Sequence, residues 1–156
     1  MEKIASFTVN HLKLKRGLYV SRKDARENVT VTTFDMRVTE PNAEPVIDTP
    51  ALHTIEHLGA TYLRNSQIKK DVVYFGPMGC RTGFYVILFG DLKPTDIYKN
   101  ICDMCVFIEN FEGDIPGAKP EECGNFSEQN LNMAKYYIKK YREDLEQFKR
   151  FEYPEN

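Results

Sequence analysis

The chain lacks the features that mark membrane, secreted and nucleic-acid-binding proteins. Its longest purely apolar run covers only residues 84–89, far short of the roughly 20 residues that span a bilayer. Lys and Arg are scattered and the net charge is −2, so no basic cluster points to nucleic acid or to a membrane surface. The first residues lack the basic and apolar regions of a signal peptide. We therefore expect a cytoplasmic protein that binds neither nucleic acid nor membrane.

Internal repeats, low-complexity tracts and linkers are also missing. At 156 residues the chain is long enough for one hydrophobic core, and we expect a single domain over residues 1–156. The sequence has four cysteines, Cys80, Cys102, Cys105 and Cys123. Because a reducing cytosol opposes disulfides, we expect these thiols to remain free for chemistry.

The residue pattern predicts an α+β domain. Runs rich in β-branched and aromatic residues predict strands over residues 4–9, 18–20, 29–38, 71–75 and 84–89. Helices are predicted over residues 49–65, 94–110 and in a long amphipathic segment that is capped near Ser127 or Asn130 and closes the chain. Two strand clusters interrupted by one helix, with two helices at the end, favour a mainly antiparallel sheet with helices packed on one face.

The most informative segment is His53-Thr54-Ile55-Glu56-His57. It follows Thr49-Pro50, which is typical of a helix with a Thr cap and a Pro at the first helical position. Residues four apart share a helix face, so His53 and His57 can bind one metal ion, and Glu56 projects beside His53. A carboxylate there can move a proton on a metal-bound molecule. The order H-x-x-E-H is that of the inverted zincins.

A solvated stripe of His and Glu is the alternative interpretation of this motif. Apolar residues surround it, however, at Ala51, Leu52, Ile55, Leu58, Ala60, Tyr62 and Leu63. The helix is therefore expected to be largely buried, and buried ionisable groups need partners. Two of the only three histidines in the chain lie here, which favours a metal site.

A catalytic metal needs a third protein ligand, for which Cys123 is the leading candidate. It precedes the last predicted helix, whose N-terminus would favour a thiolate, and Gly124 lets the backbone approach closely. Without the motif helix, a buried loop cysteine that acts as a small hydrophobic residue is a credible alternative for Cys123, and with that helix metal ligation is favoured. A set of two His and one Cys suits Fe²⁺, Co²⁺ and Zn²⁺ alike.

The remaining cysteines differ in kind. Cys80 lies in a glycine-bracketed turn beside Arg81, which can expose the sulfur and stabilise its thiolate as a nucleophile or general base. A turn cysteine without a role is the equally weighted alternative. Cys102 and Cys105 lie inside an amphipathic helix with no second close pair for a zinc knuckle, so we expect both to pack in the core.

These pieces, in their order along the chain, resemble the S-ribosylhomocysteine lyase (LuxS) family. The block from Pro77 to Tyr85, Pro-Met-Gly-Cys-Arg-Thr-Gly-Phe-Tyr, is highly specific to that family. The resemblance covers nearly the whole chain and also rests on Ser6-Phe7-Thr8-Val9-Asn10-His11, Phe34-Asp35-Met36-Arg37, His53-Thr54-Ile55-Glu56-His57-Leu58 and Cys123-Gly124.

The resemblance implies an inverted-zincin-like metalloenzyme domain and a homodimer with its active site at the subunit interface. It implies one divalent metal per subunit, Fe²⁺ with Zn²⁺ or Co²⁺ as substitutes, and products that are homocysteine and 4,5-dihydroxy-2,3-pentanedione, an autoinducer precursor. The implied roles are metal ligation by His53, His57 and Cys123; acid/base catalysis by Glu56 and Cys80; sugar binding by the partner subunit's Ser6, the partner subunit's His11 and the partner subunit's Arg37; and a place near the amino-acid end of the substrate for Arg64.

One segment departs from the family pattern. Members commonly read Ile-Asp-Ile-Ser before Pro-Met-Gly-Cys, whereas this chain has Val73-Tyr74-Phe75-Gly76. Tyr74 thus replaces an aspartate that the resemblance places near the homocysteine portion. Two other hypotheses remain at this stage: an inverted-zincin metallopeptidase in which Glu56 activates water, and a protein whose metal only stabilises the fold.

Overall fold

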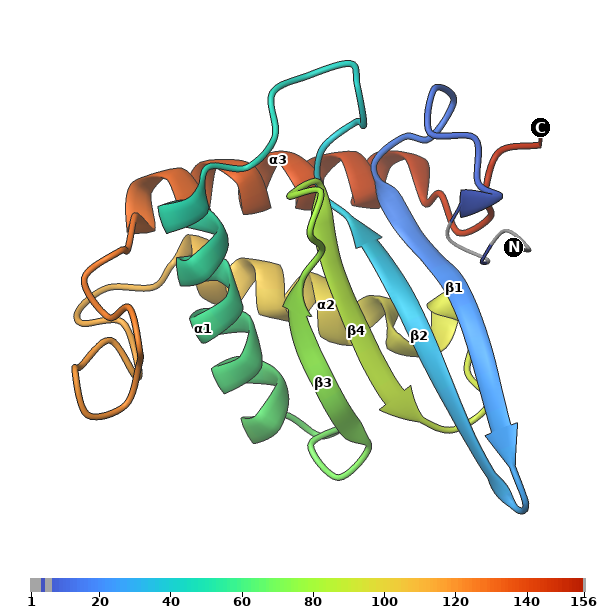
Figure 1. Ribbon diagram of the computed structural model, residues 1–156, viewed down its shortest axis with the longest axis horizontal. Coiled ribbons are helices and arrows are strands. Elements are labelled where there is room, and N and C mark those ends of the chain that lie inside the picture. Colours follow the sequence, from blue (N-terminus) through green and yellow to red (C-terminus); the bar gives the residue numbers. More distant parts are fainter. Residues whose placement is uncertain (1–3, 5–6, 156) are drawn as a thin grey trace.

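A computed structural model describes residue 4 and residues 7–155 of the chain. The described residues form an α+β fold with a four-stranded antiparallel sheet and three helices. Figure 1 shows the elements in chain order: β1 (Gly17–Arg26), β2 (Val29–Arg37), α1 (Thr49–Asn65), β3 (Val72–Pro77), β4 (Gly83–Phe89), α2 (Pro94–Glu109) and α3 (Leu131–Phe148).

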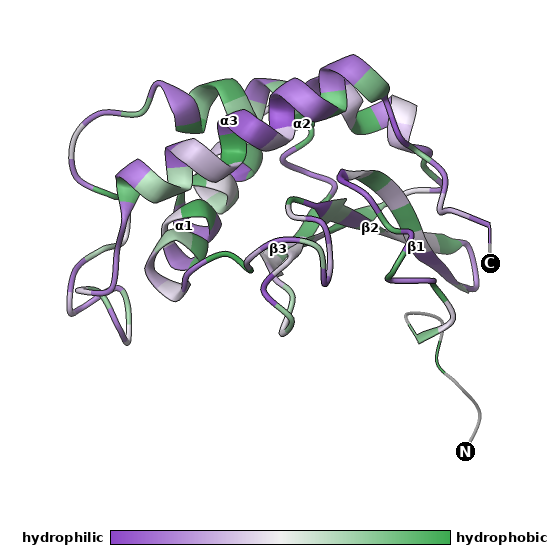
Figure 2. Ribbon diagram, turned by 90° about the horizontal axis from the view of Figure 1, so that it is seen from above, coloured by the Kyte–Doolittle hydropathy of each residue, from purple (hydrophilic) through white to green (hydrophobic). Residues whose placement is uncertain are grey.

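The sheet has the strand order β1-β2-β4-β3, with every neighbouring pair antiparallel. Figure 2 shows α2 and α3 in a layer above the strands, with α1 beside β3. Phe34 and Met36 of β2 belong to the core cluster between the layers. Because successive strand residues point to opposite faces, Asp35 and Arg37 lie on the sheet face away from the helices. The predicted packing of helices on one face is confirmed.

Local sequence explains where each helix starts. Asp48 caps α1, since its side chain accepts a hydrogen bond from the Ala51 backbone N–H, and Pro50 follows in the first turn. The prediction of Thr49 as the cap was therefore wrong by one residue. Pro94 opens α2 in the same manner, and Asn130 caps α3. None of the three helices, within the part of the chain that the structure describes, has the length and hydrophobicity needed to span a bilayer.

The predicted strand over residues 4–9 is wrong, because residues 7–9 and Ile4 lie outside any strand. The predicted strand at 18–20 is instead β1, ten residues long, paired with β2 through a two-residue turn at Glu27 and Asn28. The other strands and helices agree with prediction to within two residues, and Asn130, one of the two expected caps of the last helix, is the N-cap of α3. A tight turn between β3 and β4 is also confirmed: the Arg81 backbone N–H donates to the Met78 carbonyl at 2.9 Å, with Arg81 at φ +57°.

Candidate metal and thiol centres

Two imidazoles of α1 face each other. The Nε2 atoms of His53 and His57 lie 2.9 Å apart. Each Nδ1 lies against a main-chain carbonyl, at 3.0 Å from the Glu128 oxygen for His53 and 2.7 Å from the Pro116 oxygen for His57. A carbonyl can only accept a hydrogen bond, so both Nδ1 atoms carry the proton and both Nε2 atoms present lone pairs.

Cys123 completes a cluster with these two rings. Its Sγ lies 3.4 Å from His53 Nε2, and the three ligand atoms all lie within 4.8 Å of one another. The expected helix N-terminus is not beside the sulfur, because α3 starts only at Leu131. The Asn125 backbone N–H instead donates to Sγ at 3.5 Å.

The chemistry of this donor set fits one metal ion. Two imidazole lone pairs 2.9 Å apart repel each other unless a cation lies between them. Carbonyl groups fix the tautomer of each ring through its second nitrogen, which is the usual outer support of a metal-binding histidine. Two nitrogens and a sulfur also leave a fourth position open, as catalytic sites require.

A long loop between α2 and α3 supplies most of the support for this cluster. Residues 110–130 contain no helix or strand, yet they provide Cys123 and the carbonyls of Pro116 and Glu128. Thr54, fully buried on α1, ties the end of the loop to the helix. Its hydroxyl donates to Gln129 Oε1 at 2.7 Å and accepts from the Asn130 backbone N–H at 2.9 Å.

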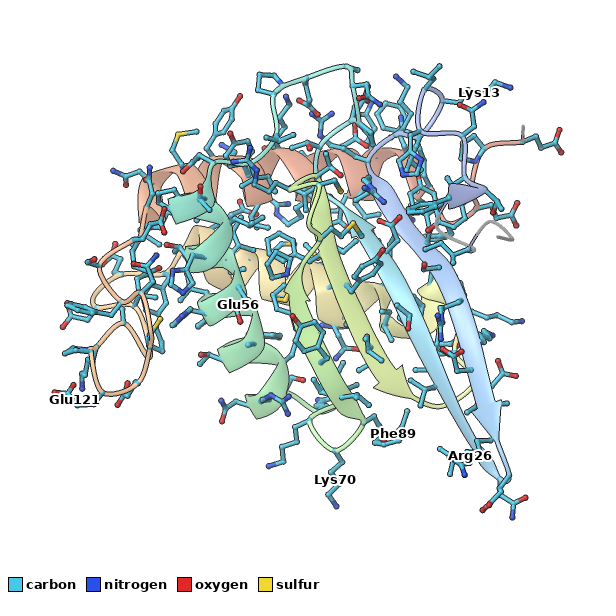
Figure 3. The ribbon with its side chains drawn as sticks, viewed as in Figure 1. Lys13, Arg26, Glu56, Lys70, Phe89 and Glu121 are labelled. Carbon is cyan, nitrogen blue, oxygen red and sulfur yellow. The ribbon has the colours of Figure 1, made fainter. Side chains whose placement is uncertain are left out.

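Glu56 lies half-buried on the same helix, between the two histidines in the sequence; Figure 3 labels it on α1. No hydrogen bond or ion pair joins its carboxylate to another residue within the described part of the chain. The carboxylate is therefore available for proton transfer, which agrees with its predicted role without testing it.

Cys80 lies in a second place, in the turn between β3 and β4. It borders a cavity of about 240 Å³ on the sheet face away from the helices. The lining residues are Phe7, Val9, His11, Ser21, Asp35, Arg37, Met78, Gly79, Cys80, Tyr85 and Tyr153. The predicted exposure of Cys80 is confirmed.

The partner of the Cys80 thiol is Arg37 rather than the neighbouring Arg81. Arg37 Nη1 lies 3.8 Å from Sγ and donates to Thr82 Oγ1 at 2.5 Å. The Thr82 hydroxyl in turn lies 3.1 Å from Sγ. Burial alone would raise the pKa of the Cys80 thiol, but the hydrogen bonds from Thr82 and the charge of Arg37 outweigh it, so the pKa lies below its usual value.

The metal cluster and the thiol cavity share no residue. None of the residues that line the cavity is a metal-cluster residue, and no hydrogen bond links Cys80 to His53, His57 or Cys123 in the described structure. The structure thus brings His11 and Arg37 together with Cys80 and keeps all three apart from the metal cluster. Ser6 lies outside the described residues.

Arg64 and Tyr74 lie near the edge strand β3. Arg64 is exposed in the last turn of α1, where its guanidinium donates to the Val73 carbonyl at 3.2 Å. Tyr74 is 47% exposed. A Cβ at Gly76 would lie 2.0 Å from the Tyr74 hydroxyl, so the absence of a side chain at Gly76 makes room for the tyrosine. The two departures from the family pattern are therefore sterically linked.

Cys102 and Cys105 belong to the hydrophobic core, as predicted. Burial raises the pKa of both thiols, which leaves them unreactive. All four cysteines are free.

Sequence reasoning missed Thr54, Thr82 and Asp35 as supporting residues. A usable signal existed for Asp35, because it is a polar residue between two apolar neighbours, Phe34 and Met36, on a buried strand. Asp35 accepts from Arg37 Nη2 at 2.6 Å and from the Tyr153 hydroxyl at 2.9 Å. The carbonyls of Pro116 and Glu128 gave no signal, since a main-chain carbonyl carries no sequence information.

Comparisons with known proteins identify the family of the chain. The model of the S-ribosylhomocysteinase (LuxS) family matches residues 4–152. The chain is 58% identical to the S-ribosylhomocysteine lyase of Finegoldia magna over 141 residues, which cover 90% of each chain. It is 55% identical to that of Clostridium acetobutylicum over 158 residues, 99% of this chain and 100% of the relative. It is 53% identical to that of Porphyromonas gingivalis over 146 residues, 93% of this chain and 92% of the relative.

Proposed function

The chain belongs to the S-ribosylhomocysteinase (LuxS) family, and we propose that it is a metal-dependent S-ribosylhomocysteine lyase. The products would be homocysteine and 4,5-dihydroxy-2,3-pentanedione, the precursor of an autoinducer. The observation that carries this proposal is the presence of two different sulfur sites. One thiol, Cys123, sits with two imidazoles, and the other, Cys80, is activated by Arg37 and Thr82.

His53, His57 and Cys123 would hold one divalent metal ion. When bound, such an ion supplies Lewis-acid stabilisation of negative charge on the oxygens of the sugar. We propose Fe²⁺ as the ion in the cell, with Zn²⁺ or Co²⁺ able to replace it, because the two-nitrogen, one-sulfur donor set suits all three.

Cleavage of the thioether requires base catalysis at carbon and at oxygen. The carbonyl of the opened ribose must move to the third carbon, after which the fourth carbon loses a proton and the thiol leaves from the fifth carbon by β-elimination. As a thiolate, Cys80 would remove the proton from the second carbon and return it to the neighbouring carbon. Glu56 would move protons among the sugar oxygens and assist elimination. The steps are isomerisations and one elimination, so no oxidant or reductant is needed.

A homodimer with its active sites at the interface is part of the proposal. Its support is the separation of the two centres within one chain, since a second copy could bring a thiol cavity to each metal cluster. His11 and Arg37 would then act on the metal site of the partner subunit. Because Cys80 shares their cavity, it would come from the same subunit as they do.

The remaining site residues keep their proposed places. Ser6, His11 and Arg37 would line the sugar pocket, and Arg64 would lie toward the amino-acid end of the substrate. We also propose that residues 1–156 form one domain of the inverted-zincin-like type and that the protein acts in the cytoplasm. One core cluster containing residues from both layers supports a single domain, and the H-x-x-E-H order along α1 supports the zincin likeness.

A thiol-release assay tests the lyase activity. Anaerobically purified protein loaded with Fe²⁺ or Co²⁺ should release homocysteine from S-ribosylhomocysteine, and the absence of free thiol would overturn the proposal. Cys80→Ala should retain its metal and lose turnover. Cys102→Ala serves as the matched control, because it removes a buried core thiol and should leave turnover intact.

The two competing hypotheses make different demands. The family match and the relatives give no support to a metallopeptidase, and that hypothesis has no use for the activated thiol of Cys80. A purely structural metal would be indifferent to Glu56. Under the lyase proposal, by contrast, Glu56→Gln should abolish turnover while metal content stays unchanged. Full turnover in this variant would favour a structural metal or a different base.

A further inference from the structure

The C-terminal segment after α3, residues 149–153, is anchored against the sheet at successive points. Lys149 turns the chain out of α3 in the left-handed region, at φ +46°. The Arg150 carbonyl then accepts from the Leu18 backbone N–H at 3.0 Å, and the Phe151 ring packs against Tyr98 with centroids 5.7 Å apart. In Figure 1 this segment lies beside the start of β1.

The anchored segment places Tyr153 in the thiol cavity. The Tyr153 ring stacks on Tyr19 with centroids 4.8 Å apart. Its hydroxyl donates to Asp35 Oδ2 at 2.9 Å. The family match ends at residue 152, so Tyr153 lies just beyond the residues that it covers.

Asp35 connects Tyr153 to Arg37 through hydrogen bonds. The same Oδ2 atom accepts from Arg37 Nη2 at 2.6 Å, while Asp35 Oδ1 and Arg37 Nε are buried without a partner in the described structure. The hydrogen bonds of the pair therefore meet at one carboxylate oxygen. A guanidinium is planar and rigid, so fixing Nη2 on Asp35 also fixes the direction in which Nη1 points. Nη1 is the atom that reaches Thr82 and Cys80.

We propose that Tyr153 is a positioning residue of the thiol centre, which acts through Asp35 to hold the Arg37 guanidinium against Cys80. The C-terminal segment then contributes to the thiol centre by placing Tyr153 beside Asp35. Burial and the nearby Asp35 carboxylate raise the pKa of Tyr153 far above its usual range, so the hydroxyl stays protonated and remains a donor at any physiological pH.

This inference rests on the proposed role of Cys80, but its test does not need lyase activity. Metal-loaded protein is treated with iodoacetamide across a pH series, and the alkylation of Cys80 is followed by peptide-resolved mass spectrometry. The midpoint of the rate against pH reports the Cys80 thiol pKa. Other titratable or charged groups beside Cys80 in the cavity are His11, Asp35, Arg37, Tyr85 and Tyr153. If S-ribosylhomocysteine is not cleaved while the Tyr153 variants raise this midpoint, the proposed function fails and this inference stands.

Tyr153→Phe keeps the stacked ring and removes only the hydroxyl. We expect the midpoint to rise by about half a pH unit or more, with a larger rise in a chain that ends at Glu152. Tyr19→Phe is the matched control, because it removes the hydroxyl of the other stacked ring. The Tyr19 hydroxyl donates to the Lys15 carbonyl and not to Asp35. Its midpoint should equal that of the wild type. An unchanged or lower midpoint in Tyr153→Phe overturns the proposal.

Asp35→Asn separates positioning from simple charge. Removal of a carboxylate near a thiol lowers the thiol pKa if charge alone matters. Release of Arg37 from its correct orientation raises that pKa instead. The proposal therefore requires a higher midpoint in Asp35→Asn, and a lower one overturns it. The melting temperature of each variant shows whether the fold is retained, and Tyr153→Phe decides the matter if Asp35→Asn unfolds.

Discussion

At the residue scale, main-chain carbonyls help to orient the two imidazoles of α1. Pro116 and Glu128 accept from the Nδ1 atoms of His57 and His53. The spacing of the histidines in the sequence predicted their shared face, because helix geometry is local. It could not predict which residues support them, since the loop that supplies the carbonyls is placed by tertiary contacts. The sequence likewise pointed to Arg81, the neighbour of Cys80, as its cationic partner. Tertiary contacts instead bring Arg37, from another strand, to the Cys80 sulfur.

Thr82→Val should raise the pKa of Cys80. The substitution removes a hydroxyl that lies 3.1 Å from Sγ and accepts from Arg37, and valine has nearly the same shape. The acid limb of the turnover-pH profile should move to higher pH, and below its midpoint the thiolate fraction should fall about tenfold for each pH unit by which the thiol pKa rises. Thr33→Val is the control, because Thr33 lies on the same sheet face outside the cavity of Cys80. A wild-type profile for Thr82→Val would contradict this role.

The sign of the linked stability effect follows from the lowered pKa of Cys80. This pKa is lower in the folded protein than in an unfolded chain. The Cys80 thiolate therefore stabilises the fold fully above the unfolded pKa of roughly 8.5, and this contribution is lost as the pH falls through the folded pKa. The effect is expected to be small because Cys80 is exposed.

At the element scale, the position of α1 against the sheet depends on a close approach at Gly59. This glycine is buried on α1, and a Cβ there would lie 2.3 Å from Cε1 of Phe75 on β3. The helix that carries both histidines is therefore seated on β3 through a contact that admits no larger side chain. Phe75 itself stacks on Phe84 of β4 with centroids 5.1 Å apart, so the ring has little freedom to move away.

Gly59→Ala should destabilise the protein although alanine is the better helix former. We expect a loss of about 1–3 kcal/mol in the free energy of unfolding from overpacking, measured by urea denaturation. Phe75→Leu introduced with it should recover part of that loss, and the double-mutant cycle isolates the contact. A Gly59→Ala variant more stable than the wild type would show that α1 can shift without cost.

The elements with strong local signals were predicted, and those fixed by tertiary contacts were not. α1 and α2 were located from their apolar periodicity and proline starts. The apolar residues at 4–9 suggested a strand, yet no neighbouring strand pairs with the described residues of that segment. β1 was predicted too short because its second half, from Arg22 onward, is exposed and polar. Pairing with β2 keeps it extended.

At the scale of the whole molecule, one chain contains two separate centres. The metal cluster and Glu56 lie on α1 and the loop at 110–130, and the activated thiol lies across the sheet with Arg37 and His11. The proposed dimer, in which each metal cluster meets the partner's thiol cavity, would combine the two centres in one active site.

Hybrid dimers test that arrangement directly. Co-expressed Cys80→Ala and Glu56→Gln chains, each inactive alone, should regain about one quarter of wild-type turnover, since half of the dimers are mixed and one of their two sites is intact. A mixture of Glu56→Gln with His53→Ala is the control and should remain inactive, because both changes affect the same centre. No recovery in the first mixture would place Cys80 and Glu56 of a working site in one subunit.

Metal removal should expose the loop at 110–130 before the rest of the protein unfolds. The loop has no helix or strand, and the proposed metal ion would add to its contacts with α1 by joining Cys123 to the two imidazoles. Figure 3 labels Glu121 at the outer end of this loop. We expect a glutamate-specific protease to cut after Glu121 or Glu122 at least about tenfold faster in the metal-free protein. Cleavage after Glu27, in the exposed turn between β1 and β2, is the internal control and should be unchanged; equal loop cleavage in both forms would contradict the prediction.

The same loop links metal supply to the lifetime of the protein. In a cell, proteases act on segments that open, and a chain without metal would present residues 110–130 to them. Newly made chains that find no ion would then be degraded, while loaded chains would persist. The abundance of the enzyme would follow the availability of its metal with no dedicated regulator, because the protease-sensitive segment contains Cys123, one of the three proposed metal ligands.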